Sequence, residues 1–135
     1  MEPSKILFVC VENAGRSQIA EGFFRKHSSK FEVISAGTEP STGLDPVVID
    51  VMREIGIDIT SQKPKLLSAD MIQESFRTVN MGCMDRESCP SLFVKDVVDW
   101  RMEDPRGKTM EEVREIRDKI KFEVFKFIKK LEDGM

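Results

Sequence analysis

The sequence has few of the residues on which several common kinds of active site depend. Its 135 residues include no tyrosine, one tryptophan and one histidine, His27. A single histidine argues against a histidine-rich metal site and against a catalytic pair of aspartate and histidine. We therefore expect neither a bound metal nor a cofactor.

Cysteine and long apolar runs are also scarce. The three cysteines are Cys10, Cys83 and Cys89. A secreted scaffold of this size held by disulfides would carry more cysteines, and an even number of them. The apolar run over residues 6–11 is far shorter than the ~20 residues of a membrane span, and it is broken too early for a signal peptide. We expect a cytoplasmic protein that does not contact membranes.

The charge balance excludes a further class of protein. Lys and Arg number 21 and Asp and Glu number 24, which gives a net charge of -3, whereas a general nucleic-acid binder usually carries a basic excess. Hydrophobic residues make up 40% of the chain and charged residues 33%, as in ordinary globular proteins. The length predicts one domain over residues 1–135, and we expect a monomer that binds no nucleic acid.

Short apolar runs alternate with helical patterns along the chain. Strands are expected over residues 5–10, 31–35, 76–80 and 97–100. Helices are expected to begin at Arg16 and after Thr109, and to cover residues 46–56 and 69–73. This alternation predicts an α/β three-layer sandwich, a parallel sheet with helices on both faces. Ligands of such sheets bind at the carboxyl ends of the strands. Cys10, the loop at Cys83 and the loop after Trp100 all belong to that edge.

Cys10 and Arg16 are separated by five residues at the first turn from strand to helix. Backbone N–H groups of such a turn converge on one point, where the helix N-terminus adds positive potential. Arg16 can hold two oxygens of an anion in a bidentate fork, and Asn13 and Gly15 tolerate the left-handed backbone of a tight loop. We expect a tetrahedral oxyanion to be bound by Val11, Glu12, Asn13, Ala14, Gly15, Arg16 and Ser17.

The same field favours the thiolate form of Cys10, which would make it a nucleophile. Ser17 is placed to donate a hydrogen bond to the sulfur. The alternative is a buried thiol that only packs at the end of a strand. Arg, Ser and Asn all occur where an anion needs them, which favours the nucleophile.

The run Cys10-Val-Glu-Asn-Ala-Gly-Arg16-Ser17, with Asp104-Pro105 far downstream, resembles the low-molecular-weight protein tyrosine phosphatase superfamily. Within it, this loop, Ser35-Ala-Gly37 and Asp104-Pro-Arg-Gly-Lys108 are most similar to arsenate reductases of the thioredoxin-coupled type. The phosphatases usually have aromatic residues after Asp-Pro, where this chain has Arg106-Gly107. The resemblance implies a four-stranded parallel sheet in the order 2-1-3-4 and reduction of arsenate to arsenite, with thioredoxin as the reductant.

Asp104 is the candidate general acid that the resemblance implies. A carboxylic acid there would protonate the leaving oxygen as the thiolate attacks, and Pro105 would stiffen the loop that presents it. The alternative is an aspartate that only caps a loop, which is common before proline.

The second and third thiols separate a reductase from a phosphatase. A phosphatase needs one thiol, whereas reduction of arsenate takes two electrons, which two thiols supply by forming a disulfide. The implied strand order puts Cys10 and Cys83 at the ends of neighbouring strands, roughly 4.8 Å apart and within reach of a disulfide. Cys89 would then attack Cys83 and carry the disulfide to thioredoxin. Zinc ligation by Cys83 and Cys89, or inert packing, is the alternative.

Two other functions stay open on the sequence alone. A low-molecular-weight phosphatase would hydrolyse phosphate monoesters without Cys83 and Cys89. A non-enzymatic module for oxyanion binding or redox sensing would bind phosphate, or form a disulfide, without turnover.

Overall fold

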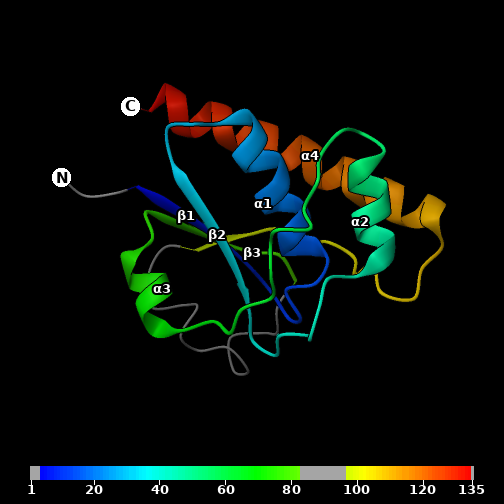
Figure 1. Cartoon of the computed structure of the whole chain (residues 1–135). Coiled ribbons are helices and arrows are strands. Elements are labelled where there is room, and N and C mark those ends of the chain that lie inside the picture. Colours follow the sequence, from blue (N-terminus) through cyan, green and yellow to red (C-terminus); the bar gives the residue numbers. More distant parts are fainter. Residues whose placement is uncertain (1–3, 83–96, 135) are drawn as a thin grey trace.

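A computed structural model describes residues 4–82 and 97–134, and in these ranges the predicted sheet is present. Its parallel strands are β1 (Lys5–Cys10), β2 (Glu32–Gly37), β3 (Arg77–Asn80) and β4 (Val97–Asp99). They follow the predicted order β2-β1-β3-β4, with β1 paired to both β2 and β3 (Figure 1). Cys10 therefore stands at the carboxyl end of a central strand.

Local capping signals fix where the helices begin. The helices are α1 (Arg16–His27), α2 (Pro46–Arg53), α3 (Ala69–Glu74) and α4 (Met110–Asp133). Asp45 accepts a hydrogen bond from the Val47 N–H at 3.0 Å at the start of α2, and Thr109 forms the predicted capping box with Glu112 at the start of α4. No helix in the described ranges has both the length and the apolar character that crossing a membrane requires.

Several element boundaries differ from the sequence prediction by one to three residues. β2 runs on to Gly37, because Phe8, Val9 and Cys10 pair with its last three residues. α2 ends at Arg53, before the left-handed turn at Gly56, where φ is +84°. β4 ends at Asp99, one residue before Trp100.

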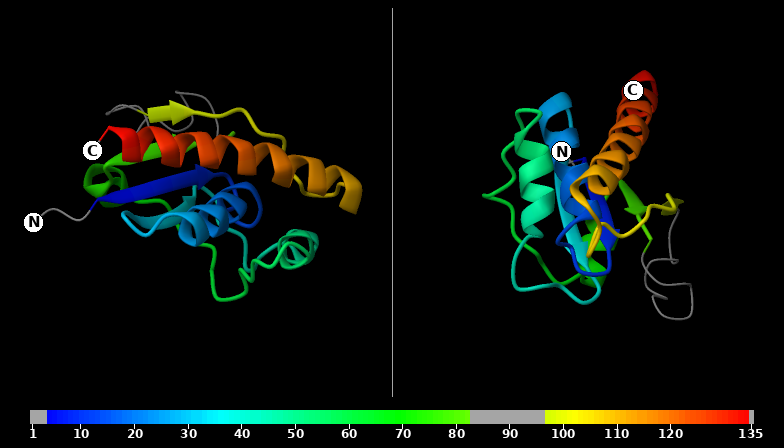
Figure 2. Two further views of the ribbon diagram at one scale, coloured as in Figure 1. Left: turned by 90° about the horizontal axis from the view of Figure 1, so that it is seen from above. Right: turned by 90° about the vertical axis from the view of Figure 1, so that its right-hand side faces the viewer.

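The two faces of β1 enter two separate apolar cores, which makes the molecule three-layered. Ile6, Phe8 and Cys10 belong to the larger core, with α1, α2 and α4, whereas Leu7 and Val9 belong to a smaller one with α3. The ring centroid of Phe8 lies 6.0 Å from that of Phe24, 5.8 Å from Trp100 and 6.3 Å from Phe127. α4 spans the length of the molecule and packs on α1 and α2 (Figure 2).

Candidate active site

The connection from β1 to α1, with the first turn of α1, forms a loop whose N–H groups are available to a ligand. We call residues 11–17 the anion loop. Its carbonyls are bonded away from the ligand side: Val11 O accepts from Glu39 N at 2.8 Å, Glu12 O from Ser41 N at 2.9 Å and Ala14 O from Asp45 N at 3.1 Å. The N–H groups of the first turn of a helix have no acceptor within the helix, and Gly15 provides no side-chain cap. The loop is thus rich in donors at one end of the sheet.

Asn13 sets the course of the anion loop. Its φ is +53°, the left-handed conformation that was predicted there. The side-chain oxygen accepts a hydrogen bond from Lys65 N at 2.9 Å, and the backbone oxygen accepts one from Gln18 Nε2 at 2.8 Å. Asn13 is fully buried, so its conformation is held from both sides.

Gly15 is required for a different reason from the one predicted. We expected Gly15 to take the left-handed backbone of a tight loop. Its φ is -132°, which is not left-handed, so that expectation is wrong. A Cβ at this position would lie 2.6 Å from Cγ of Pro105. Gly15 therefore allows the loop that carries Asp104 to pack directly on the anion loop.

The thiol of Cys10 is buried, and its sulfur lies 2.9 Å from the Ser17 hydroxyl oxygen, the contact that was predicted. Asn13 Nδ2 donates to the same hydroxyl oxygen at 2.6 Å. Because the Ser17 oxygen accepts a hydrogen bond from Asn13, the Ser17 hydroxyl proton is free to point at the sulfur. A donor in this place stabilises a thiolate.

Arg16 is buried at the start of α1, with 7% of its surface exposed. Its Nη1 donates to the carbonyl oxygens of Gly82 at 3.4 Å and Met102 at 3.2 Å, while Nη2 lies 3.8 Å from Asp104 Oδ2. Two neutral carbonyls orient the guanidinium without cancelling its charge. The guanidinium is therefore held in one direction and can clamp an anion.

Sequence reasoning missed the carbonyls that hold Arg16. They are backbone groups, so the residue types at positions 82 and 102 do not mark them. One signal was present: Gly82 has φ +99°, and any Cβ there would collide with Arg16 Nη1. A glycine two residues after a strand was the available clue to this close approach.

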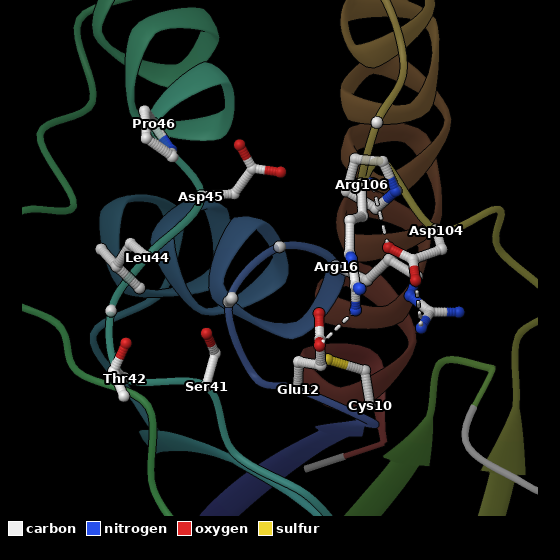
Figure 3. Close-up of a pocket in the computed structure, with 15 residues that line it drawn as sticks. Cys10, Glu12, Arg16, Ser41, Thr42, Leu44, Asp45, Pro46, Asp104 and Arg106 are labelled. Atoms are coloured by element: carbon white, nitrogen blue, oxygen red, sulfur yellow. Dashed lines mark hydrogen bonds and ion pairs between the residues drawn. The ribbon is translucent and has the colours of Figure 1, made fainter.

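Asp104 reaches the site in a way compatible with both predicted roles. Its Oδ1 accepts a hydrogen bond from the Arg106 N–H at 3.0 Å, which is a loop cap. Its Oδ2 faces Arg16. Cys10, Arg16 and Asp104 line one cavity of about 580 Å³ (Figure 3). The structure thus brings these three predicted residues together.

Cys83 and Cys89 lie outside the described residues. Gly82, which precedes Cys83, is described, and its carbonyl contacts Arg16. The last described residue before position 83 therefore contacts the anion loop. In the described part of the chain, no group of three His, Cys, Asp or Glu side chains could hold a metal ion.

Comparisons with known proteins agree on one family. The family model for low molecular weight phosphotyrosine protein phosphatase matches residues 5–134. An arsenate reductase of Staphylococcus aureus (strain Newman) is 35% identical over 130 residues, which cover 94% of this chain and 98% of that protein.

Two solved structures of arsenate reductases have the same fold. The thioredoxin-dependent arsenate reductase of Corynebacterium glutamicum superposes with a TM-score of 0.82 at 32% identity, over 98% of this chain and 64% of that longer chain. An arsenate reductase in the phosphate binding state superposes with a TM-score of 0.80 at 33% identity, and the match covers 94% of this chain and 98% of that chain. The chain belongs to the low molecular weight phosphotyrosine protein phosphatase family.

Proposed function

We propose that this protein reduces arsenate to arsenite. The observation that carries the proposal is the single cavity onto which the Cys10 thiol, the Arg16 guanidinium and the Asp104 carboxyl all open. A tetrahedral oxyanion fits that combination of nucleophile, clamp and acid. The arsenate reductases among its relatives support arsenate as the oxyanion.

In the first step, the oxyanion binds to the N–H groups of the anion loop and to Arg16. The Cys10 thiolate attacks arsenic, a bond from arsenic to oxygen breaks, and the oxygen leaves as water after taking a proton from Asp104. The Ser17 hydroxyl, 2.9 Å from the sulfur, stabilises the thiolate before the attack. The product is an adduct with arsenic bonded to the Cys10 sulfur.

The electrons come from a second thiol. The Cys83 thiolate attacks the sulfur of Cys10, and the bond from sulfur to arsenic breaks. Its electron pair stays on arsenic, which leaves as arsenite, and a Cys10–Cys83 disulfide forms. The contact of the Gly82 carbonyl with Arg16 supports this assignment, because Cys83 follows directly along the chain.

Cys89 regenerates the nucleophile. Its thiolate attacks Cys83, releases Cys10 as a thiolate and leaves a Cys83–Cys89 disulfide. The dithiol of thioredoxin then reduces this disulfide and becomes a disulfide itself. Likeness to a thioredoxin-dependent relative supports this choice of reductant. We also propose that the chain works as a single domain in the cytoplasm.

The test is a single-turnover reduction of arsenate by the reduced protein, with disulfides mapped by mass spectrometry. Cys89→Ala is expected to release one arsenite and stop as Cys10–Cys83. Cys83→Ala is expected to release none without an added thiol, and Cys10→Ser to be inactive, because a serine hydroxyl is not ionised where a thiolate is. Continued cycling of Cys89→Ala with thioredoxin would remove the third thiol from the relay.

A phosphate-ester assay on the same preparations separates this function from a phosphatase. Hydrolysis of an ester needs Cys10, Arg16 and Asp104 but neither of the other thiols. Any ester turnover should therefore survive Cys83→Ala and Cys89→Ala, while arsenite release does not. A protein that hydrolyses esters efficiently and releases no arsenite is a phosphatase.

A further inference from the structure

A salt bridge joins the anion loop to the loop that carries Asp104. Arg106 Nη1 donates to Glu12 Oε2 at 2.5 Å. Both residues line the cavity with Cys10, yet the Arg106 side chain is 71% exposed and that of Glu12 32%. Figure 3 shows the two side chains meeting beside Cys10. The salt bridge therefore lies where the cavity opens to solvent.

Neither stability nor loop docking explains this pair. An exposed salt bridge contributes little to folding, and the two loops also meet through a separate contact, that of Pro105 with Gly15. Glu12 is, moreover, one of three carboxylates among the described residues that line the cavity, with Asp45 and Asp104, and it belongs to the anion loop itself. Left unpaired, it would repel the substrate, and Arg106 neutralises it.

The part of the cavity wall that the structure describes has apolar side chains at Leu44, Pro46 and Pro105 but no ring on which an aryl group could stack. Among the described residues that line it, none is aromatic. A phenyl ring that projected from a bound phosphate would find no ring to stack on there, whereas Glu12 and Arg106 line the same cavity and are partly exposed. A free oxyanion has no such group to accommodate.

We propose that the Glu12–Arg106 salt bridge selects the substrate. It admits a free tetrahedral oxyanion, such as arsenate or phosphate, and hinders an aryl phosphate ester, whose organic group must pass the bridge. This inference rests on the proposed function and deepens it, because it assigns unesterified oxyanions as the substrate class.

The test compares the binding of inorganic phosphate and phenyl phosphate by calorimetry, in a Cys10→Ser background that cannot turn over. The readout is the dissociation constant for phenyl phosphate divided by that for phosphate. Joint replacement Glu12→Gln and Arg106→Gln should lower this ratio about two- to fivefold, the range that an exposed salt bridge supports. The matched control is Glu103→Gln with Lys108→Gln, because that 3.2 Å salt bridge lies on the same loop but does not line the cavity.

Single replacements separate charge from bulk. Arg106→Gln leaves Glu12 unpaired, so phosphate itself should bind more weakly, whereas Arg106→Lys keeps the charge pair and should restore binding. Glu12→Gln removes the carboxylate and leaves the positive charge of Arg106 uncompensated beside the cavity, so phosphate should bind more tightly. In 1 M salt the Debye length falls to about 3 Å. The ratio of the phenyl phosphate to the phosphate dissociation constant should then fall in the Cys10→Ser protein that keeps the salt bridge, but not in the protein that also carries Glu12→Gln and Arg106→Gln.

The two proposals fail in different ways. An unchanged ratio in the double variant, with phosphate still bound, overturns the selecting role of the salt bridge and leaves the anion site intact. If the Cys10→Ser protein does not bind phosphate at all, the anion site itself is refuted. If phosphate binds selectively but the wild-type protein releases no arsenite, the reductase function alone fails.

Discussion

At the scale of single residues, the site depends on groups that hold other groups in place. Asn13 donates to Ser17, which leaves the Ser17 proton for Cys10. Arg16 is oriented by the carbonyls of Gly82 and Met102. A catalytic side chain with such fixed neighbours loses little entropy when the substrate binds.

Arg16→Lys tests whether the planar fork matters beyond its charge. A lysine ammonium is a point charge and cannot make the paired hydrogen bonds of a guanidinium. We expect the dissociation constant for phosphate, measured by calorimetry, to rise about tenfold to a hundredfold, which corresponds to the loss of a charge-assisted hydrogen bond. Arg101→Lys, on an exposed residue near the same edge, should leave it unchanged. Equal affinities for wild type and Arg16→Lys would remove Arg16 as the clamp.

Elements were largely predictable because their signals are local. The caps at Asp45, Ser68 and Thr109 each depend on contacts two or three residues away. Residue 13 and its left-handed backbone were predictable for the same reason. The packing of Gly15 on Pro105 and the salt bridge of Glu12 depend on residues about ninety positions later, and no local pattern reports such contacts.

The same distinction applies to the site as a whole. Cys10, Arg16 and Asp104 could be predicted together because a resemblance to known proteins carried information about distant parts of the chain. The backbone carbonyls at positions 82 and 102 could not, since any residue type supplies a carbonyl. The positions of Cys83 and Cys89 lie outside the described residues, so their relay stays a prediction.

Glu54, at the end of α2, links that helix to α4. Arg114 Nε donates to it at 2.8 Å and Arg117 Nη1 at 2.6 Å. These hydrogen bonds, first from Arg114 and then from Arg117, lower the pKa of Glu54 from 4.5 to about 2. A carboxylate whose pKa is lower in the folded state than in the unfolded state stabilises the protein. This stabilisation is complete at pH values above the pKa of the unfolded state, and it is lost as the pH falls toward the pKa of the folded state.

Glu54→Gln should therefore destabilise the protein in a pH-dependent way. The difference in free energy of unfolding between wild type and variant should be full above about pH 4.5 and should shrink as the pH falls toward 2. Urea denaturation from pH 7 to pH 3 measures it. Glu115→Gln, on an exposed residue of α4, controls for the loss of one negative charge. A pH-independent difference would show that the two arginines do not act through the ionised carboxylate.

At the scale of the whole molecule, one aromatic cluster joins the sheet to helices on the face that carries the larger apolar core. Phe8 of β1 lies at its centre, in ring contact with Phe24 of α1, Trp100 after β4 and Phe127 of α4. Phe8 is fully buried. These four residues come from four separate parts of the chain, so the cluster packs distant segments of the sequence against one another.

Phe8→Ala should lower the free energy of unfolding by about 3–5 kcal/mol, from lost burial plus the cavity left behind. Phe122→Ala is the control, because that ring is 62% exposed and its loss should cost less than about 1 kcal/mol. Chemical denaturation measures both. If Phe8→Ala does not fold, Phe8→Leu gives a smaller loss that can be measured. Equal effects at positions 8 and 122 would contradict a core centred on Phe8.

The place of α4 in the chain has a consequence for how the protein is synthesised. A ribosome makes β1, the anion loop and α1 early, and makes α4 last of the described elements, although α4 packs on both α1 and α2. The carbonyl of Met102 and the carboxyl of Asp104, which hold Arg16, are also translated late. The nascent chain therefore carries the Cys10 thiol without its finished surroundings for most of its elongation, which proceeds at about 5–20 residues per second. During those seconds the thiol lacks the loop that carries Asp104 and Pro105, so it is more open to oxidants and to other nascent chains than in the folded protein.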